Sequence, residues 1–206
     1  MAAMFLPSVF AFGQTETILH DFIALPHGAV PEASVIADSA GNLYGTTTDG
    51  GLYGFGTVFK LSPASGSKWT QTVLYNFTNA SDGSYPTAGL IFDGAGNLYG
   101  TTTTGGAFCL SFSCDGVDGT VFELSPNSDG TWSETTLYSF GATGDGSDPV
   151  AGVVFDKNGN LYGTTYYGGF ENWGTVFELS PSSSGWTETI LLKFTDEQDG
   201  PIRSVA

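Results

Sequence analysis

Basic residues are scarce in this chain of 206 residues, which contains four Lys and one Arg against 21 Asp and Glu. The formal net charge is −16 at pH 7. Proteins that bind nucleic acid need clustered cations to displace the counterions of the phosphate backbone, so this class is excluded. Binding to anionic lipid is disfavoured for the same reason. An acidic surplus keeps a protein soluble, and it can also attract cations such as Ca²⁺.

Helical periodicity and long apolar runs are missing as well. No stretch of 11–18 residues places its apolar side chains at helical spacing. The apolar residues 1–13 are too few to span a membrane. We interpret them as the remnant of a secretory signal peptide, with a strand or disordered terminus of a cytoplasmic protein as the alternative. We therefore expect no transmembrane segment, and a protein that is secreted or lies at the cell surface or in the periplasm.

Turn-forming and aromatic residues are abundant instead. The chain holds 30 Gly, nine Pro, 16 Phe, nine Tyr and four Trp. This composition predicts many short strands joined by tight turns, and hence an all-β fold.

Three copies of one unit fill most of the chain. The motif Gly-Asn-Leu-Tyr-Gly-Thr-Thr begins at Gly41, Gly96 and Gly159, so the copies are 55 and then 63 residues apart. After each motif come Gly-Thr-Val-Phe, Leu-Ser-Pro, a tryptophan, an apolar segment that ends in Phe, and an Asp-Gly turn with a proline. Repeats of this length indicate a solenoid or a propeller.

The first unit divides into four predicted strands, at 33–38, 43–47, 56–61 and 69–77. We expect Ser62 and Pro63 to end the third strand, because proline cannot donate to the ladder. The strands carry apolar residues on both faces. This suits a four-stranded antiparallel sheet that packs between two similar sheets, as the blades of a β-propeller do. A linear β-solenoid is the alternative, although its repeats are usually shorter.

We predict a single repeat domain over residues 14–206, with units at 23–77, 78–140 and 141–194 and a partial blade at each end. Residues 14–22 match the fourth strand of a unit, and residues 199–206 match the start of a first strand. Closed propellers typically have about four to eight blades. The predicted partners are therefore further repeats of a longer protein, of which this chain is a fragment, or other copies that close a ring by self-association.

The repeated motifs resemble those of the GloVer tandem-repeat family. The resemblance lies in the GNLYGTT, GTVF and LSP motifs, the tryptophan and the Asp-Gly turn, and it extends over residues 14–206. It implies a bacterial exported or surface protein of a family with varied C-terminal anchors, and it supplies no catalytic residues. The Asp-x-x-Gly-Asn-Leu-Tyr core is more distantly similar to NHL-type propeller blades, which bears on fold and not on function.

The loops between the second and third strands differ among the units, as loops of a recognition surface do. Aromatic rings beside Asp suit stacking on sugars and recognition of their hydroxyl groups. The candidate ligand-binding residues are Asp49, Tyr53, Phe55, Phe108, Asp118, Tyr166, Tyr167, Phe170 and Trp173. The alternative interpretation is that most of these rings pack between blades.

The second unit carries an eight-residue insertion that contains both cysteines, Cys109 and Cys114. In an exported protein we expect them to form a disulfide that clamps this loop. Closure of so short a ring stabilises by roughly 2 kcal/mol in the chain-entropy model. Free thiols and half of a metal site are the alternatives, and both histidines, His20 and His27, are distant in sequence.

Signatures of catalysis and of tight metal binding are sparse. The chain has no GxSxG, CxxC or HExxH motif and no phosphate-binding loop. The turns at 38–42, 93–97 and 156–160 are interpreted as Asp residues that bond their own backbone, with cation ligation as the alternative. Asp145 and Asp148 partly resemble a Ca²⁺ loop but lack its full ligand set. No other cofactor is expected.

These features predict a non-catalytic binding or adhesion module for a glycan or another extracellular polymer. A polysaccharide hydrolase or lyase that uses Asp or Glu near the propeller channel is one alternative. Its carboxylate pair is not singled out, because Glu123 and Glu178 stand where the first unit has Lys60. A purely structural spacer is the other alternative.

Overall fold

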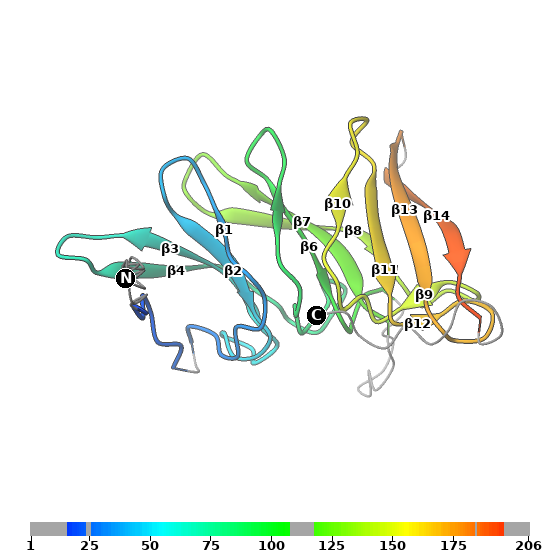
Figure 1. The fold of residues 1–206 in the computed structure, drawn as a ribbon, viewed down its shortest axis with the longest axis horizontal. Helices are drawn as coiled ribbons and strands as arrows, with labels where there is room; N and C mark the ends of the chain where they lie inside the picture. Colours follow the sequence, from blue (N-terminus) through cyan, green and yellow to red (C-terminus); the bar gives the residue numbers. More distant parts are fainter. Residues whose placement is uncertain (1–15, 24–25, 108–117, 184, 196–206) are drawn as a thin grey trace, which may run out of the picture.

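The computed structural model describes residues 16–23, 26–107, 118–183 and 185–195. Within these ranges, three four-stranded antiparallel sheets follow one another along the chain (Figure 1). We call them blades 1, 2 and 3. The described part of the chain contains no helix that is long and apolar enough to cross a membrane.

Each blade is a meander in which strands that follow one another in the blade pair side by side. Blade 1 contains β1 (Ile36–Ala37), β2 (Leu43–Thr47), β3 (Thr57–Pro63) and β4 (Trp69–Asn76). Blade 2 contains β5 (Ile91–Phe92), β6 (Leu98–Thr102), β7 (Thr120–Pro126) and β8 (Trp132–Ser139). Blade 3 contains β10 (Val154–Phe155), β11 (Leu161–Thr165), β13 (Thr175–Ser182) and β14 (Gly185–Lys193). A separate two-stranded ladder joins β9 (Gly146–Ser147) to β12 (Tyr167–Gly168).

The strands agree with the predicted meander except at their ends. The first strand of blade 1 pairs with β2 only over Ile36–Ala37, so it is shorter than the predicted 33–38. The third strand runs two residues past the predicted end, through Pro63, which lies opposite Trp69. Proline is tolerated there because it stands at the last position of the hairpin ladder, next to the turn.

The hydrophobic core lies between the blades. Phe77 at the end of blade 1 packs on Phe122 of blade 2, with ring centroids 5.2 Å apart. Phe140 packs in the same way on Phe177 of blade 3, at 5.1 Å. All four rings are fully buried. The prediction that each sheet is packed face to face against its neighbours is therefore confirmed, and the fold is an all-β, propeller-like array.

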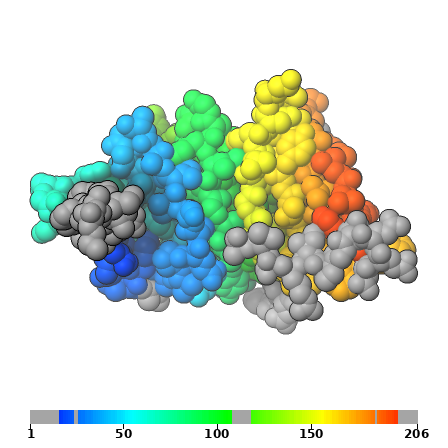
Figure 2. Space-filling view, in the orientation of Figure 1, coloured from blue at the N-terminus to red at the C-terminus, as the bar shows by residue number. Residues whose placement is uncertain are grey.

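Hydrogen bonds also cross between blades. The Thr46 hydroxyl donates to the carbonyl of Ala88 at 3.0 Å, and Thr101 donates to that of Ala151 at 3.1 Å. These bonds tie the second strand of one blade to the residues that enter the next blade. The blades consequently stand as adjacent ridges on the molecular surface (Figure 2).

Residues 16–22 do not form the predicted fourth-strand ladder. No third strand of a preceding blade lies beside residues 16–22 within the described structure. Their backbone groups therefore have no strand with which to pair. Their apolar contact is nevertheless that of a fourth strand, because Phe22 packs on Phe59 with a centroid distance of 4.9 Å. The side chain thus keeps the phenylalanine contact seen between the complete blades.

Candidate functional site

The blades expose two different rims. We call residues 38–42, 93–97 and 156–160 the turn rim; the corresponding hairpins project at the top of Figure 1. The loop rim, at the opposite end, consists of loops 48–56 and 166–174, the described residues 103–107 and 118–119 of the loop in blade 2, and the connections that enter each blade. Backbone pairs hold each loop to its connection, since Ala29 bridges to Asp49, Ser84 to Thr104, and β9 to β12. The structure therefore brings the described parts of the variable loops and the connections together at one rim.

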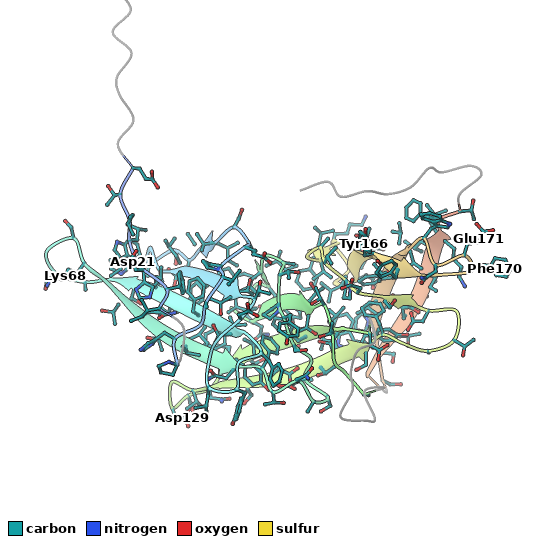
Figure 3. The ribbon with its side chains drawn as sticks, turned by 90° about the horizontal axis from the view of Figure 1, so that it is seen from below. Asp21, Lys68, Asp129, Tyr166, Phe170 and Glu171 are labelled. Atoms are coloured by element: carbon teal, nitrogen blue, oxygen red, sulfur yellow. The ribbon has the colours of Figure 1, made fainter. Side chains whose placement is uncertain are left out.

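Blade 3 presents three exposed aromatic residues among the predicted ligand-binding residues. Phe170 is 86% exposed, Tyr166 41% and Trp173 37%. Tyr166 and Tyr167 meet edge to face with their centroids 4.6 Å apart. Phe170 projects from the end of the loop, beyond Tyr166 (Figure 3). Such rings are available to a partner because the blade does not need them for its core.

The candidate residues of blade 1 divide into exposed and packed. Tyr53 is 55% exposed, and Asp49 is exposed while its backbone forms the bridge to Ala29. Phe55 instead packs against Tyr85 at 6.0 Å and against the core between blades 1 and 2. For Phe55 the structure supports the alternative interpretation, packing between blades.

The insertion of blade 2 lies largely outside the described residues. Phe108, Cys109 and Cys114 all fall within 108–117, so the predicted disulfide and the role of Phe108 stay predictions. Asp118, the first described residue after this gap, is half-buried. Burial, together with the charge of Asp145, raises the pKa of its carboxyl group.

The two residues proposed to bind Ca²⁺ have other contacts. Asp145 accepts from the Tyr138 hydroxyl at 3.0 Å and from the Gly146 amide at 2.6 Å. Asp148 has φ +58° just before Pro149, and burial raises the pKa of its carboxyl. In the described ranges, no three His, Cys, Asp or Glu side chains are grouped so that they could hold a metal ion. The calcium hypothesis gains no geometric support from these residues.

A buried cluster of acids recurs where one blade meets the next. At the junction of blades 1 and 2, Asp82 accepts from the Tyr75 hydroxyl at 3.0 Å and from Thr78. Burial raises the pKa of nearby Glu134 to about 7, and the charge of Asp82 adds to this shift. Asp82 is only 7% exposed, which leaves no room for a substrate.

Blades 2 and 3 repeat this arrangement. The Tyr138 hydroxyl lies 3.0 Å from Asp145 Oδ2 and 3.4 Å from Glu188 Oε2. Burial raises the pKa of Glu188 to about 8, and its contact with Asp145 acts in the same direction. A feature that is repeated and closed at both junctions is best explained as structural, and it was not found from the sequence because its residues come from two blades.

The turn rim is built from one repeated set of side-chain bonds. Asp38 Oδ1 accepts from the amides of Ala40 and Asn42, both at 2.9 Å, and its Oδ2 accepts from Asn42 Nδ2 at 2.7 Å. The Asn42 side-chain bond is the main reason that the pKa of Asp38 falls to about 2. Asp93 and Asp156 make the corresponding bonds. The interpretation of these residues as self-bonding turns is confirmed.

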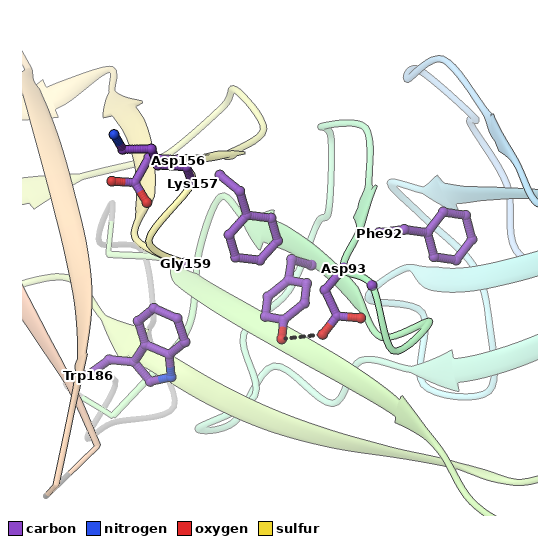
Figure 4. A pocket seen from close by; sticks show the side chains of 9 residues that line it. Phe92, Asp93, Asp156, Lys157, Gly159 and Trp186 are labelled. Atoms are coloured by element: carbon purple, nitrogen blue, oxygen red, sulfur yellow. Dashed lines mark hydrogen bonds between the residues drawn. The ribbon is translucent and has the colours of Figure 1, made fainter.

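A hollow of about 500 Å³ opens between blades 2 and 3 at the turn rim (Figure 4). Aromatic and charged side chains line it together: Phe92, Asp93, Tyr99, Phe155, Asp156, Lys157 and Trp186. The Tyr99 hydroxyl donates to Asp93 at 3.2 Å. Sequence reasoning missed this hollow, although the recurring Tyr and Trp of each unit mark its walls.

The serial sheets, the interblade cores and the tandem motifs define a propeller-type repeat protein. The family model of the Gloeobacter/Verrucomicrobia repeat matches residues 8–205, and the chain belongs to this family. The family resemblance seen in the motifs is thereby confirmed. No curated protein matches the chain.

Proposed function

We propose that this repeat protein is an exported, non-catalytic binding module whose loop rim recognises glycans of an extracellular polymer. The observation that carries the proposal is the loop of blade 3, where Tyr166, Phe170 and Trp173 are exposed together, whereas Phe59, Phe77, Phe122, Phe140 and Phe177 are fully buried. Pockets that bind organic ligands combine such aromatic surface with a few polar groups. The acidic residues of the same rim supply acceptors for sugar hydroxyl groups.

A hydrolase is the weaker proposal for this geometry. The carboxyl groups with raised pKa, Glu134 and Glu188, lie in the repeated interblade clusters with buried Asp82 and Asp145. A general acid must reach the bond that it protonates. Asp82 and Asp145 are buried between the blades and Glu134 and Glu188 are half-buried beside them, which gives a glycosidic bond little access to these groups.

The test is binding of the purified chain to a glycan array and to insoluble polysaccharides. The triple variant Tyr166→Ser, Phe170→Ser, Trp173→Ser should lose binding by about tenfold or more, as expected when aromatic anchors are removed from an interface. Its melting temperature should stay close to that of the wild type, because the three side chains contribute little to the core. Val154→Ala, at a site that is 60% exposed on blade 3 but away from this loop, is the matched control.

Unchanged binding by the folded triple variant would exclude the blade 3 loop as the site. Failure of the wild-type chain to bind any glycan or polysaccharide would overturn the proposed function itself. Export is tested separately, by locating the full-length protein in cell fractions.

A further inference from the structure

The hollow at the turn rim has a counterpart at the preceding junction, and the two differ in one informative way. Between blades 1 and 2, Tyr44 is packed by Phe92 at 5.1 Å and by Trp132 at 6.4 Å, measured between ring centroids. The ammonium group of Lys60 then lies 5.6 Å from the centroid of the Tyr44 ring. A cation within about 6 Å of an aromatic face is held by the ring quadrupole. At this junction the chain therefore supplies its own ammonium group.

The equivalent site between blades 2 and 3 has the aromatic walls without the internal cation. Tyr99 takes the place of Tyr44 and packs on Phe155 at 4.9 Å. Glu123 lies opposite Tyr99 in the β6–β7 ladder, where Lys60 lies opposite Tyr44 in blade 1. Trp186 corresponds to Trp132, and it lines the hollow of about 500 Å³ together with Tyr99 and Phe155.

The charges around this hollow are predominantly negative. Turn hydrogen bonds outweigh burial and hold the pKa of Asp93 and of Asp156 below its usual range, so both carboxylates are ionised at neutral pH. Glu123 adds a third acidic group beside Tyr99. Lys157 is the one basic residue that lines the hollow in the described structure, and it lies next to Asp156 on the turn of blade 3 (Figure 4).

We propose that this hollow is a binding site for an alkylammonium group, either of a free quaternary amine or of a methylated lysine side chain. Aromatic rings with flanking carboxylates are the chemistry that recognises such cations. The hollow is larger than one alkylammonium group, so it can also accept such a group when the group is attached to a larger molecule. The hollow lies at the turn rim, opposite the blade 3 loop (166–174) that is proposed to bind glycans. The inference does not depend on that proposed function.

The first experiment measures ligand binding to the purified chain by NMR titration and calorimetry. Choline is the probe, and 3,3-dimethyl-1-butanol, which has the same shape without the charge, is its control. Choline should bind at least about fivefold more tightly than the neutral compound, the factor expected from one cation–π contact. A second arm uses a short peptide with trimethyllysine against the same peptide with norleucine. Choline binding alone assigns a small-molecule site, and peptide binding alone assigns a protein-recognition site.

The decisive variant is Glu123→Lys, which copies the arrangement of blade 1. The new ammonium group should lie over Tyr99 as Lys60 lies over Tyr44, and choline binding should fall about fivefold or more. Because blade 1 already tolerates Lys at this position, the fold should be preserved. Glu178→Lys makes the same change at the equivalent position of blade 3, outside the hollow, and should leave binding nearly unchanged.

The variant Lys157→Gln should bind choline more tightly than the wild type. It removes the one positive charge that lines the hollow, so choline should bind about twofold to fivefold more tightly at low salt. Equal affinity for choline and its neutral analogue would overturn the proposal, as would equal losses in Glu123→Lys and Glu178→Lys. Trp186→Ala should weaken choline binding, whereas Trp132→Ala, at the junction where Lys60 lies over Tyr44, should not.

Discussion

The glycine of each Leu-Tyr-Gly-Thr-Thr strand is required by a phenylalanine of the neighbouring strand. A Cβ atom added at Gly100 would lie 2.7 Å from Cζ of Phe122 and 2.9 Å from Cδ2 of Leu90. Gly45 and Gly163 have the same contact with Phe59 and Phe177. The ring fills the space above the strand because no side chain occupies it. This explains the motif by packing and not by backbone conformation.

Gly100→Ala should therefore destabilise the chain by about 1–3 kcal/mol, the usual cost of overpacking a dense core. The loss should be seen as a lower urea midpoint of unfolding. Gly94→Ala is the control, because nothing lies within 4 Å of its added Cβ. Equal stability of the two variants would contradict the packing explanation.

At the scale of the strands, each junction joins a Tyr and an Asp of one blade to a Glu on the fourth strand of the next. Tyr75, Asp82 and Glu134 form one set, and Tyr138, Asp145 and Glu188 form the other. Blade 1 carries Gln71 at the position of these glutamates, and there it donates to the carbonyl of His27 at 2.8 Å. An amide thus fits the same place in the fold.

The junctions should make stability depend on pH. The folded pKa of Glu134, about 7, lies above its ordinary value of 4.5 because the carboxyl group is buried, so folding favours the protonated form. Its stabilising contribution is complete below about pH 4.5 and is lost as the pH rises through about 7. Glu134→Gln should remove this contribution. Between pH 5 and 8 the free energy of unfolding of the variant should therefore fall by roughly 1–2 kcal/mol less than that of the wild type, after allowance for the partial exposure of Glu134.

Urea unfolding at several pH values measures this effect. Glu178→Gln is the matched control, on the third strand of blade 3 and away from both clusters, and its pH profile should follow that of the wild type. Parallel profiles for Glu134→Gln and the wild type would show that the junction carboxyls do not govern the decline. Burial raises the pKa of Glu188 to about 8, so this group should extend the decline to higher pH.

At the scale of the whole molecule, the array has an apolar face on β14 that no described sheet covers. Leu192 is 42% exposed and stands at the position of Tyr75 and Tyr138, which face the following blade. The residues of blades 1 and 2 that correspond to Phe194 are Phe77 and Phe140, and both are fully buried. Blade 3 thus presents the same kind of surface that blades 1 and 2 bury.

We expect this face to drive association of the isolated chain. Light scattering after size exclusion should show a rising average mass with protein concentration. Leu192→Asp should reduce this association, because it places a charge in an apolar contact. Val154→Asp, at another exposed position of blade 3, is the control. A wild-type chain that stays monomeric over the whole concentration range would contradict the expectation.

The sequence by itself determined the features that depend on neighbours along the chain. The repeat, the four strands and the Asp turns could be predicted because their bonds join residues that are close in sequence, as Asp38 joins Asn42 and Tyr44. The tertiary structure alone decided that Phe55 packs on Tyr85, that Glu188 approaches Tyr138 from 50 residues away, and that a hollow opens beside Trp186 between blades 2 and 3. These contacts lie between blades, where small differences in how two sheets meet decide whether a ring is buried or exposed.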